Sequence, residues 1–243
     1  MKRAAIQFIR GEPALLIRKQ RTVVIGDLHI GVELGLGTQG IHVSNASQRL
    51  ASRINSLQDM CGARSLVFLG DIKESIGHPT KEEADAIRIF FRALSCKKIG
   101  IAKGNHDANL KEIVASLGLD IEMGKELFVG DCALLHGNAL PSDDAMRKRY
   151  IITGHMHPAL FVGGEKRKVW LISRLGKKSA AYKHGKETEL IIAPAFNDLI
   201  VGSAIDRRTK ARHPLFKNDV FDFGTTKVFG LDGDLIGKID GLR

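Results

Sequence analysis

The segment Val23-Val24-Ile25-Gly26-Asp27-Leu28-His29 is an apolar run that ends in a glycine, a carboxylate and an imidazole. The same pattern returns along the chain at residues 66–71, 99–107, 134–137 and 151–157. Short apolar, β-branched runs of this kind are typical of buried strands. Ligands of α/β sheets bind beyond the carboxyl ends of the strands. Five strands that each deliver Asp, Asn or His to that edge therefore predict one shared site.

Amphipathic segments separate the first of these runs. Residues 50–57 repeat Leu and Ile at helical spacing, and residues 80–94 open with the capping-box pattern Thr80-Lys81-Glu82-Glu83. A third helical segment begins with a similar pattern at residues 109–112 and ends at Gly118. Alternation of strand and helix predicts right-handed crossovers and a parallel core sheet.

The rhythm changes near residue 127, where short strands begin to dominate. We expect strands at residues 132–135, 151–153, 169–172, 189–192, 220–223, 227–229 and 235–236. The composition does not shift sharply. We therefore predict a single domain over residues 1–243 with a second, more antiparallel sheet. Two domains that meet near residue 125 are the alternative.

The composition of the 243 residues excludes several classes of protein. The chain is 44% hydrophobic and 26% charged, which is typical of a globular domain and not of a disordered one. It has no apolar run long enough for a membrane span and no signal-peptide pattern at Met1. Its three cysteines form no CxxC, so we expect reduced thiols and a cytoplasmic location. The net charge of +10 indicates an anionic partner.

The residue types at the strand ends indicate metal binding. Carboxylate oxygens, amide oxygens and imidazoles suit Mn²⁺, Fe²⁺ or Zn²⁺. Asp27 and His29 are two residues apart, and so are His155 and His157. Two such pairs with a shared carboxylate can hold two ions about 3.5–4 Å apart, as two-metal hydrolases do. Any one of these residues alone is more often a cap or a turn residue, and the ordered set carries the prediction.

These motifs resemble, in the same order, the five motifs of the calcineurin-like metallophosphoesterase superfamily. They are Gly26-Asp27-Leu28-His29, Gly70-Asp71, Gly104-Asn105-His106-Asp107, His136-Gly137 and Gly154-His155-Met156-His157. The flanking Gly31-Val32-Glu33 and the compact size resemble an archaeal-type subgroup related to DNA-repair exonucleases and ligase-associated phosphoesterases. The resemblance implies an α/β four-layer sandwich, in which two mixed β-sheets are flanked by helices.

The resemblance also implies a role for each motif residue. One metal would take Asp27, His29, Asp71 and His157, and the other would take Asp71, Asn105, His136 and His155, with Asp71 bridging the two ions. Manganese is the first expectation for both ions, and iron, zinc or nickel also fit. His106 would protonate the leaving oxygen.

An imidazole that acts as an acid needs a partner that orients it. In the superfamily this partner commonly sits three residues after the bridging Asp, which is Glu74 here. Nuclease-type relatives tend to have His at that position, and this departure weakens the specific case for a nuclease. The neighbouring Lys73 either contacts phosphate or is solvated.

Positive charge is concentrated around the last motif. Between Ala145 and Lys186 the sequence has one acidic residue, Glu165, and eleven basic ones. We call these eleven the basic block; they are Arg147, Lys148, Arg149, Lys166, Arg167, Lys168, Arg174, Lys177, Lys178, Lys183 and Lys186. Such a block near the site would attract polyanions, and Arg147, Lys166 and Arg167 are the candidate substrate contacts. A solvated basic face is the alternative. His42, His78, His184 and His213 match no motif, and we expect them in loops or at the surface. Asp107 is expected to begin a helix.

The sequence therefore predicts a metal-dependent phosphoesterase that cleaves phosphodiester bonds of nucleic acid, DNA or RNA, or of nucleotides. A phosphomonoesterase or small-nucleotide phosphodiesterase is one alternative. A catalytically weak nucleic-acid-binding module that keeps its metal is another. The sequence leaves the oligomeric state open.

Overall fold

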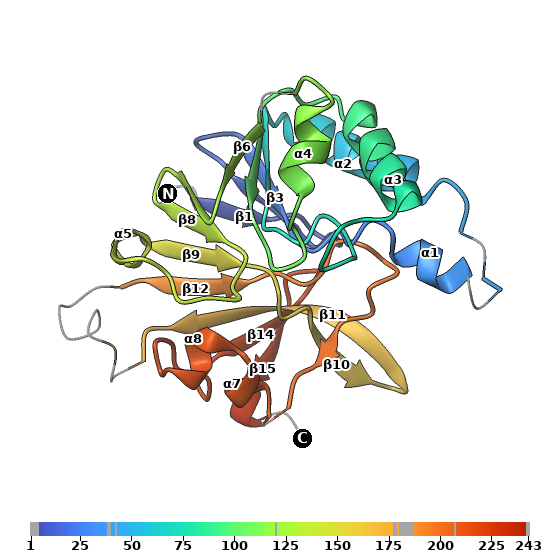
Figure 1. The fold of residues 1–243 in the computed structure, drawn as a ribbon. Coiled ribbons are helices and arrows are strands. Elements are labelled where there is room, and N and C mark those ends of the chain that lie inside the picture. The colour runs from blue at the N-terminus through green and yellow to red at the C-terminus, as the bar shows by residue number, and fades with distance from the viewer. Residues whose placement is uncertain are drawn as a thin grey trace.

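The computed structural model describes residues 5–37, 40–41, 43–119, 121–176, 179, 187–206 and 208–241. Two β-sheets lie face to face in it, with helices on the outer side of each (Figure 1). The predicted α/β sandwich of two mixed sheets flanked by helices is confirmed.

Six strands form the first sheet within the described residues, in the order β1-β2-β3-β4-β5-β6. Their bounds are β1 Ile6–Phe8, β2 Ala14–Ile17, β3 Thr22–Ile25, β4 Ser65–Phe68, β5 Ile99–Ala102 and β6 Ile121–Gly124. Strands β3 to β6 are parallel, as predicted, and β1 and β2 add an antiparallel edge. The crossover helices are α2 Ala46–Cys61, α3 Lys81–Ala93 and α4 Leu110–Ala115, and the short α1 Val32–Gly37 follows β3.

The second sheet is mixed and has the path β13-β10-β11-β12-β9-β8-β7, with β14 paired to β11 and β15 paired to β14. Its strands are β7 Glu126–Val129, β8 Cys132–Leu135, β9 Tyr150–Thr153, β10 Pro158–Val162, β11 Glu165–Arg174, β12 Glu189–Ile192, β13 Ser203–Ala204, β14 Lys227–Gly230 and β15 Leu235–Lys238. Short helices α5 Asp143–Met146, α7 Thr209–Arg212 and α8 Pro214–Lys217, and the 3₁₀ turn Ile239–Gly241, complete the order. The parallel pairs β8–β9 and β9–β12 bring two motif loops to one edge.

Three hydrophobic cores separate the four layers. The strands of the first sheet are apolar throughout because both of their faces are buried: Val23 and Ile25 pack toward the helices, and Val24 packs toward the second sheet. The core between the sheets contains Trp170, whose ring lies edge-to-face with Phe8 at 4.8 Å between centroids. A third core places the second sheet on α8. The middle core is formed by strands of both sheets, and a single domain over residues 1–243 stays a prediction.

Local sequence signals had mixed outcomes. The Thr80 hydroxyl caps α3 by accepting the N–H of Glu83 at 3.2 Å, as the capping box predicts. Asn109 precedes α4 without a side-chain cap, so the second box is wrong. The predicted strand at residues 220–223 is wrong. Only an isolated antiparallel bridge joins Phe221 to Leu175, and the segment does not join the predicted meander. Strands β1, β2, β6, β7, β10 and β13 were not predicted.

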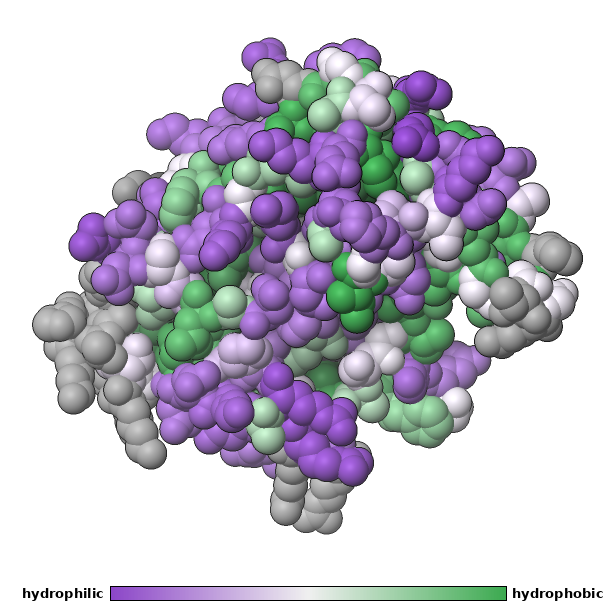
Figure 2. Space-filling model, in the orientation of Figure 1, coloured by the Kyte–Doolittle hydropathy of each residue, from purple (hydrophilic) through white to green (hydrophobic). Residues whose placement is uncertain are grey.

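Figure 2 shows that hydrophilic residues cover most of one face, with hydrophobic residues exposed in smaller areas between them. A search of the described residues for a helix of the length and apolarity needed to cross a membrane found none.

Candidate metal centre

Five loops at the carboxyl ends of β3, β4, β5, β8 and β9 meet at one place. The first two run side by side beyond their strands, because the N–H of His29 donates to the Asp71 carbonyl at 2.9 Å and that of Ile30 donates to Ile72 at 2.8 Å. On the other sheet, the N–H of Gly154 donates to the His136 carbonyl at 2.9 Å. Backbone hydrogen bonds thus hold the motif loops in register with one another.

Asp107 ties the loops after β4 and β5 together. Its buried carboxylate accepts the N–H groups of Asp71 at 2.9 Å, Ile72 at 2.8 Å and Gly104 at 2.7 Å. The expectation that Asp107 begins a helix is wrong, since α4 starts three residues later. The carboxylate supports the backbone on which Asp71 is mounted.

The backbone of the site is strained. Asp27, His29, Asp71, His155 and His157 have φ between 44° and 65°, a region that non-glycine residues rarely adopt. Conformations of this kind cost about 1–3 kcal/mol each and persist where the surrounding structure imposes them. The left-handed turns point these side chains into the space between the loops.

Glycines next to the motif residues are required by close packing. A Cβ on Gly104 would overlap the Asp71 carboxylate, and a Cβ on Gly154 would overlap that of Asp27. No larger residue fits at either position without moving a carboxylate of the site.

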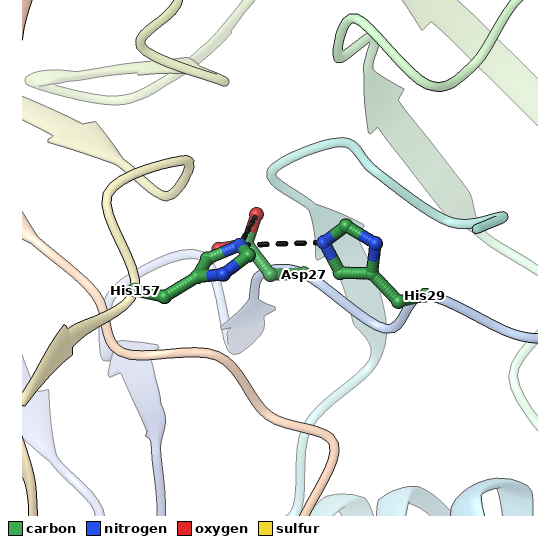
Figure 3. A group of neighbouring side chains, drawn as sticks. All are labelled: Asp27, His29 and His157. Carbon is green, nitrogen blue, oxygen red and sulfur yellow. Dashed lines mark hydrogen bonds and ion pairs between the residues drawn. The ribbon is translucent and has the colours of Figure 1, made fainter. Parts of the chain in front are cut away.

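The first cluster consists of Asp27, His29 and His157. Figure 3 shows the three side chains pointing toward one another. The His157 Nε2 atom lies 3.1 Å from Asp27 Oδ1 and 3.3 Å from His29 Nε2. His29 Nδ1 is occupied by Glu74 Oε2 at 2.7 Å, so the Nε2 atom of His29 is the one that faces the cluster.

The second cluster consists of Asp71, His136 and His155, with Asn105 beside it. His136 Nε2 lies 3.2 Å from Asp71 Oδ2, 3.0 Å from His155 Nδ1 and 3.1 Å from Asn105 Oδ1. His136 Nδ1 donates to the Leu69 carbonyl at 2.8 Å, which leaves only Nε2 to face these three groups.

The donor set fits a divalent cation. Three acceptor atoms, from Asp71, Asn105 and His155, surround His136 Nε2. A single N–H on that nitrogen can donate a good hydrogen bond to only one of these acceptors. A divalent cation between the four groups could be coordinated by all of them. Asp71 lies between the clusters, since its Oδ2 is also 3.8 Å from His29 Nε2.

The pKa values reflect this crowding of acids and imidazoles. Burial lowers the pKa of His136, but its hydrogen bond to Asp71 and the carboxylate charges outweigh burial and raise it to about 9. Burial raises the pKa of Asp71, and the interaction with His136 outweighs it and lowers the value to about 2. Burial and the charge of His136 lower the pKa of His155 to about 4. The carboxylates that raise the pKa of His136 would also attract a divalent cation.

Glu74 and His106 are arranged differently from the prediction. The Glu74 carboxylate contacts His29, and His106 Nδ1 instead hydrogen-bonds to the backbone carbonyl of Glu74. His29, Glu74 and His106 also lie close enough to be a third possible metal group. Because Glu74 already accepts from His29 Nδ1, we assign it to orienting His29. His106 Nε2 lies 3.9 Å from Asp71 Oδ2.

Lys73 does not face the site. Its side chain is fully buried, and its ammonium donates to the Gly77 carbonyl at 2.7 Å and to the carbonyl of Ser75. Both predicted alternatives for Lys73, phosphate contact and solvation, are therefore wrong. The ammonium holds its own loop, because a buried charge needs several acceptors.

The remaining predicted substrate contacts lie on the surface. Arg147 follows α5 and pairs with Asp144 at 3.0 Å. Lys166 and Arg167 lie at the β10–β11 hairpin, where Lys166 donates to the Gly202 carbonyl at 3.2 Å. The structure brings none of the three into hydrogen-bond contact with the clusters, within the described residues. The basic residues Lys177, Lys178, Lys183 and Lys186, together with His42 and His184, lie outside the described residues.

Sequence reasoning missed His213, which was expected in a loop or at the surface. It is buried beside the second cluster, with its ring centroid 6.4 Å from that of His155, and neither ring nitrogen has a hydrogen-bond partner within the described chain. Burial and the charges of His155 and His136 lower its pKa to about 3. No local signal marks this residue, because its neighbours come from distant parts of the chain.

Comparison with known proteins establishes the fold. No family model matches the chain, and no curated protein sequence matches it. The structure is similar to that of the Pseudomonas putida nuclease MPE, with a TM-score of 0.57 and 19% identity over 90% of this chain and 89% of that one. The Escherichia coli phosphoesterase Yfce gives a TM-score of 0.40 with 16% identity, over 89% and 97% of the two chains. Only the first score is high enough to indicate a shared fold, and at this identity it establishes the fold alone.

Proposed function

We propose that this protein is a metal-dependent phosphoesterase that hydrolyses phosphodiester bonds of nucleic acid or nucleotides. The observation that carries the proposal is the position of Asp71. Its Oδ2 atom lies 3.2 Å from His136 Nε2 in one cluster and 3.8 Å from His29 Nε2 in the other, which supports the proposal of a carboxylate shared by two ions. The protein of similar fold is named a nuclease, which agrees with this reaction class.

In this proposal the ligand sets follow the two clusters. Asp27, His29, Asp71 and His157 hold one divalent ion, and Asp71, Asn105, His136 and His155 hold the other. Manganese is the first candidate, and iron, zinc and nickel fit the same donors. Bound ions would supply Lewis-acid activation of water and neutralisation of phosphate charge.

The protein's own contribution is orientation and proton transfer. The Glu74 carbonyl keeps the proton on His106 Nδ1, so that Nε2 is the atom turned toward the Asp71 side of the site. A protonated Nε2 is then placed to give its proton to a leaving oxygen. Glu74 fixes the His29 ring by accepting from Nδ1, and Leu69 does the same for His136.

The test is manganese-dependent hydrolysis of a thymidine dinucleotide by wild type, His106→Ala and His78→Ala. The leaving alkoxide of this substrate needs a proton, whereas a p-nitrophenolate leaves without one. Loss of the acid should lower kcat by about a hundredfold or more while metal content stays unchanged. His78 is an exposed histidine near Glu74 in sequence and serves as the matched control, with unchanged kcat.

A panel of single- and double-stranded DNA, RNA, cyclic nucleotides and monoesters identifies the substrate class. Preference for monoesters would favour the phosphomonoesterase alternative. If metal-loaded protein hydrolysed no phosphate ester but still bound nucleic acid, the enzyme proposal would fail in favour of a binding module. A cytoplasmic location and the nucleic-acid partner belong to the same proposal.

A further inference from the structure

A cleft of about 730 Å³ opens beside the second cluster. His136 and Gly104 form its inner end, and the side chains of Lys103, Lys125, Phe128 and Leu140 line its outer part. We call it the β7 cleft, since β7 supplies one wall. Its volume falls within the range of ligand pockets, about 300–1,000 Å³. A group bound in it would lie next to the phosphate at the metal centre.

Two lysine side chains without a partner among the described residues, Lys103 and Lys125, line the β7 cleft. Lys103 follows β5, and its N–H donates to the Gly124 carbonyl at 2.7 Å, which joins it to the turn that carries Lys125. Both side chains are exposed, and in the described part of the chain neither ammonium has a hydrogen-bond or ion-pair partner. They are therefore available to an anion from solution.

One acid also lines the cleft, but it is engaged. The Glu126 carboxylate accepts the Ser142 N–H at 2.7 Å and its hydroxyl at 2.5 Å. These bonds fix the loop that leads to α5 and direct both carboxylate oxygens toward it. The unpaired charge facing the cleft is accordingly positive.

The cleft also exposes an aromatic ring. Phe128 is 47% exposed and Leu140 is 52% exposed, although both are large apolar side chains. The Lys148 ammonium lies over one face of the Phe128 ring, 5.4 Å from its centroid, and donates to the Gly130 carbonyl at 3.1 Å, so a base would stack on the other face. An exposed aromatic face among cations is the combination by which proteins bind unpaired nucleotides, since the base stacks on the ring and the phosphates meet the ammonium groups.

On the basis of the proposed function, we propose that the β7 cleft binds one nucleotide of a single-stranded nucleic acid, adjacent to the phosphate held at the metal centre. Phe128 stacks on the base, and Lys103 and Lys125 contact the neighbouring backbone phosphates. The strand must be unpaired, because the faces of bases inside a duplex are covered by their neighbours.

The test compares Phe128→Ala and the double variant Lys103→Gln/Lys125→Gln with wild type on two substrates. Hydrolysis of bis-p-nitrophenyl phosphate, which carries neither a base nor a neighbouring backbone phosphate, should stay within about twofold of wild type in both variants. The KM for a short single-stranded thymidine oligonucleotide should rise about tenfold in Phe128→Ala. In the lysine variant the salt dependence of oligonucleotide binding should become shallower, by about 0.7 for each phosphate that the protein no longer neutralises.

Matched controls are available outside the β7 cleft. Phe161→Ala removes another exposed phenylalanine, which is 68% exposed on β10, and Lys111→Gln removes an exposed lysine on α4. Neither should change the oligonucleotide KM. Phe128→Leu keeps an apolar side chain without the aromatic face and should resemble Phe128→Ala, which separates stacking from loss of structure.

The outcomes separate the two proposals. If wild type hydrolyses the small diester but the Phe128 and lysine variants bind the oligonucleotide as wild type does, the cleft proposal is overturned and the proposed function stands. An equal effect of Phe128→Ala on a duplex of the same sequence would overturn the stacking role. If wild type hydrolyses neither substrate, the proposed function fails, and binding of the thymidine oligonucleotide to wild type and to the variants still tests the cleft.

Discussion

Replacing Asp107 by Asn should destabilise the protein through the backbone beneath the metal centre. One carboxylate oxygen accepts the N–H groups of Asp71 and Gly104, and the other accepts the N–H of Ile72. The Asn oxygen can take the place of the first, but its NH₂ group then faces the N–H of Ile72. The variant loses one hydrogen bond to a charged acceptor and leaves a buried donor unpaired.

The size of the effect follows from those two losses. A hydrogen bond to a charged group contributes about 1.5–3 kcal/mol, and an unsatisfied buried group costs about 1–3 kcal/mol. Since the two overlap, we expect the free energy of unfolding to fall by about 3 kcal/mol. With a urea m-value of about 3 kcal/mol/M, the midpoint should drop by about 1 M.

The assay is equilibrium urea unfolding in the presence of a chelator, so that metal binding does not contribute to stability. Asp85→Asn is the control, because Asp85 makes only a surface ion pair with Arg88, worth less than about 0.5 kcal/mol. A fall of less than about 0.5 kcal/mol in Asp107→Asn would refute the argument that this carboxylate supports the loops. A metal affinity unchanged from wild type would refute its connection to Asp71.

Two further predictions concern residues around the clusters. His213 has a pKa of about 3 in the fold against about 6.5 unfolded, so the unfolded state binds more protons between these values and stability falls as pH drops through that window. At pH 5 the free energy of unfolding should be about 2 kcal/mol lower than at neutral pH because of this residue. In His213→Phe or His213→Gln that part of the pH dependence of urea unfolding should disappear. An unchanged pH dependence would contradict the neutral, buried state of His213. Glu74→Ala should weaken metal binding by about 10–100-fold in equilibrium dialysis, because His29 loses the acceptor at 2.7 Å from its Nδ1. Glu74→Gln should keep most of the affinity, because its amide oxygen can still accept from His29. Glu82→Ala, on the exposed first turn of α3, is the control, and equal affinities of Glu74→Ala and wild type would show that Glu74 does not orient His29.

The central strands and the motif loops could be predicted because their signals are local. The runs before Gly26, Gly70 and Gly104 are apolar on both faces, and each is followed by a turn that carries polar side chains. The edge strands β1 and β13 could not be found this way, since they are short and their pairing depends on a partner strand elsewhere in the chain.

Side-chain partners were the weakest part of the prediction. Glu74 lies in the expected loop, but whether its carboxylate meets His29 or His106 depends on a few ångströms of loop position. The capping-box residue Glu83 contributes its N–H to the Thr80 hydroxyl, yet its carboxylate turns to the Ser75 hydroxyl and N–H instead of completing the box. Lys73 similarly satisfies carbonyls of its own loop.

The motif residues could be selected from the chain alone, because ligand type, glycine spacing and strand ends are properties of short segments. Which of them lie in contact with one another depends on the packing of the folded layers. His213 approaches His155 across 58 positions of sequence, and the β7 cleft brings Lys103, Phe128 and His136 together from different strands of two sheets. Such contacts arise from the packing of one layer on another, and no local pattern in the chain encodes the distance between two side chains that meet only after both sheets have formed.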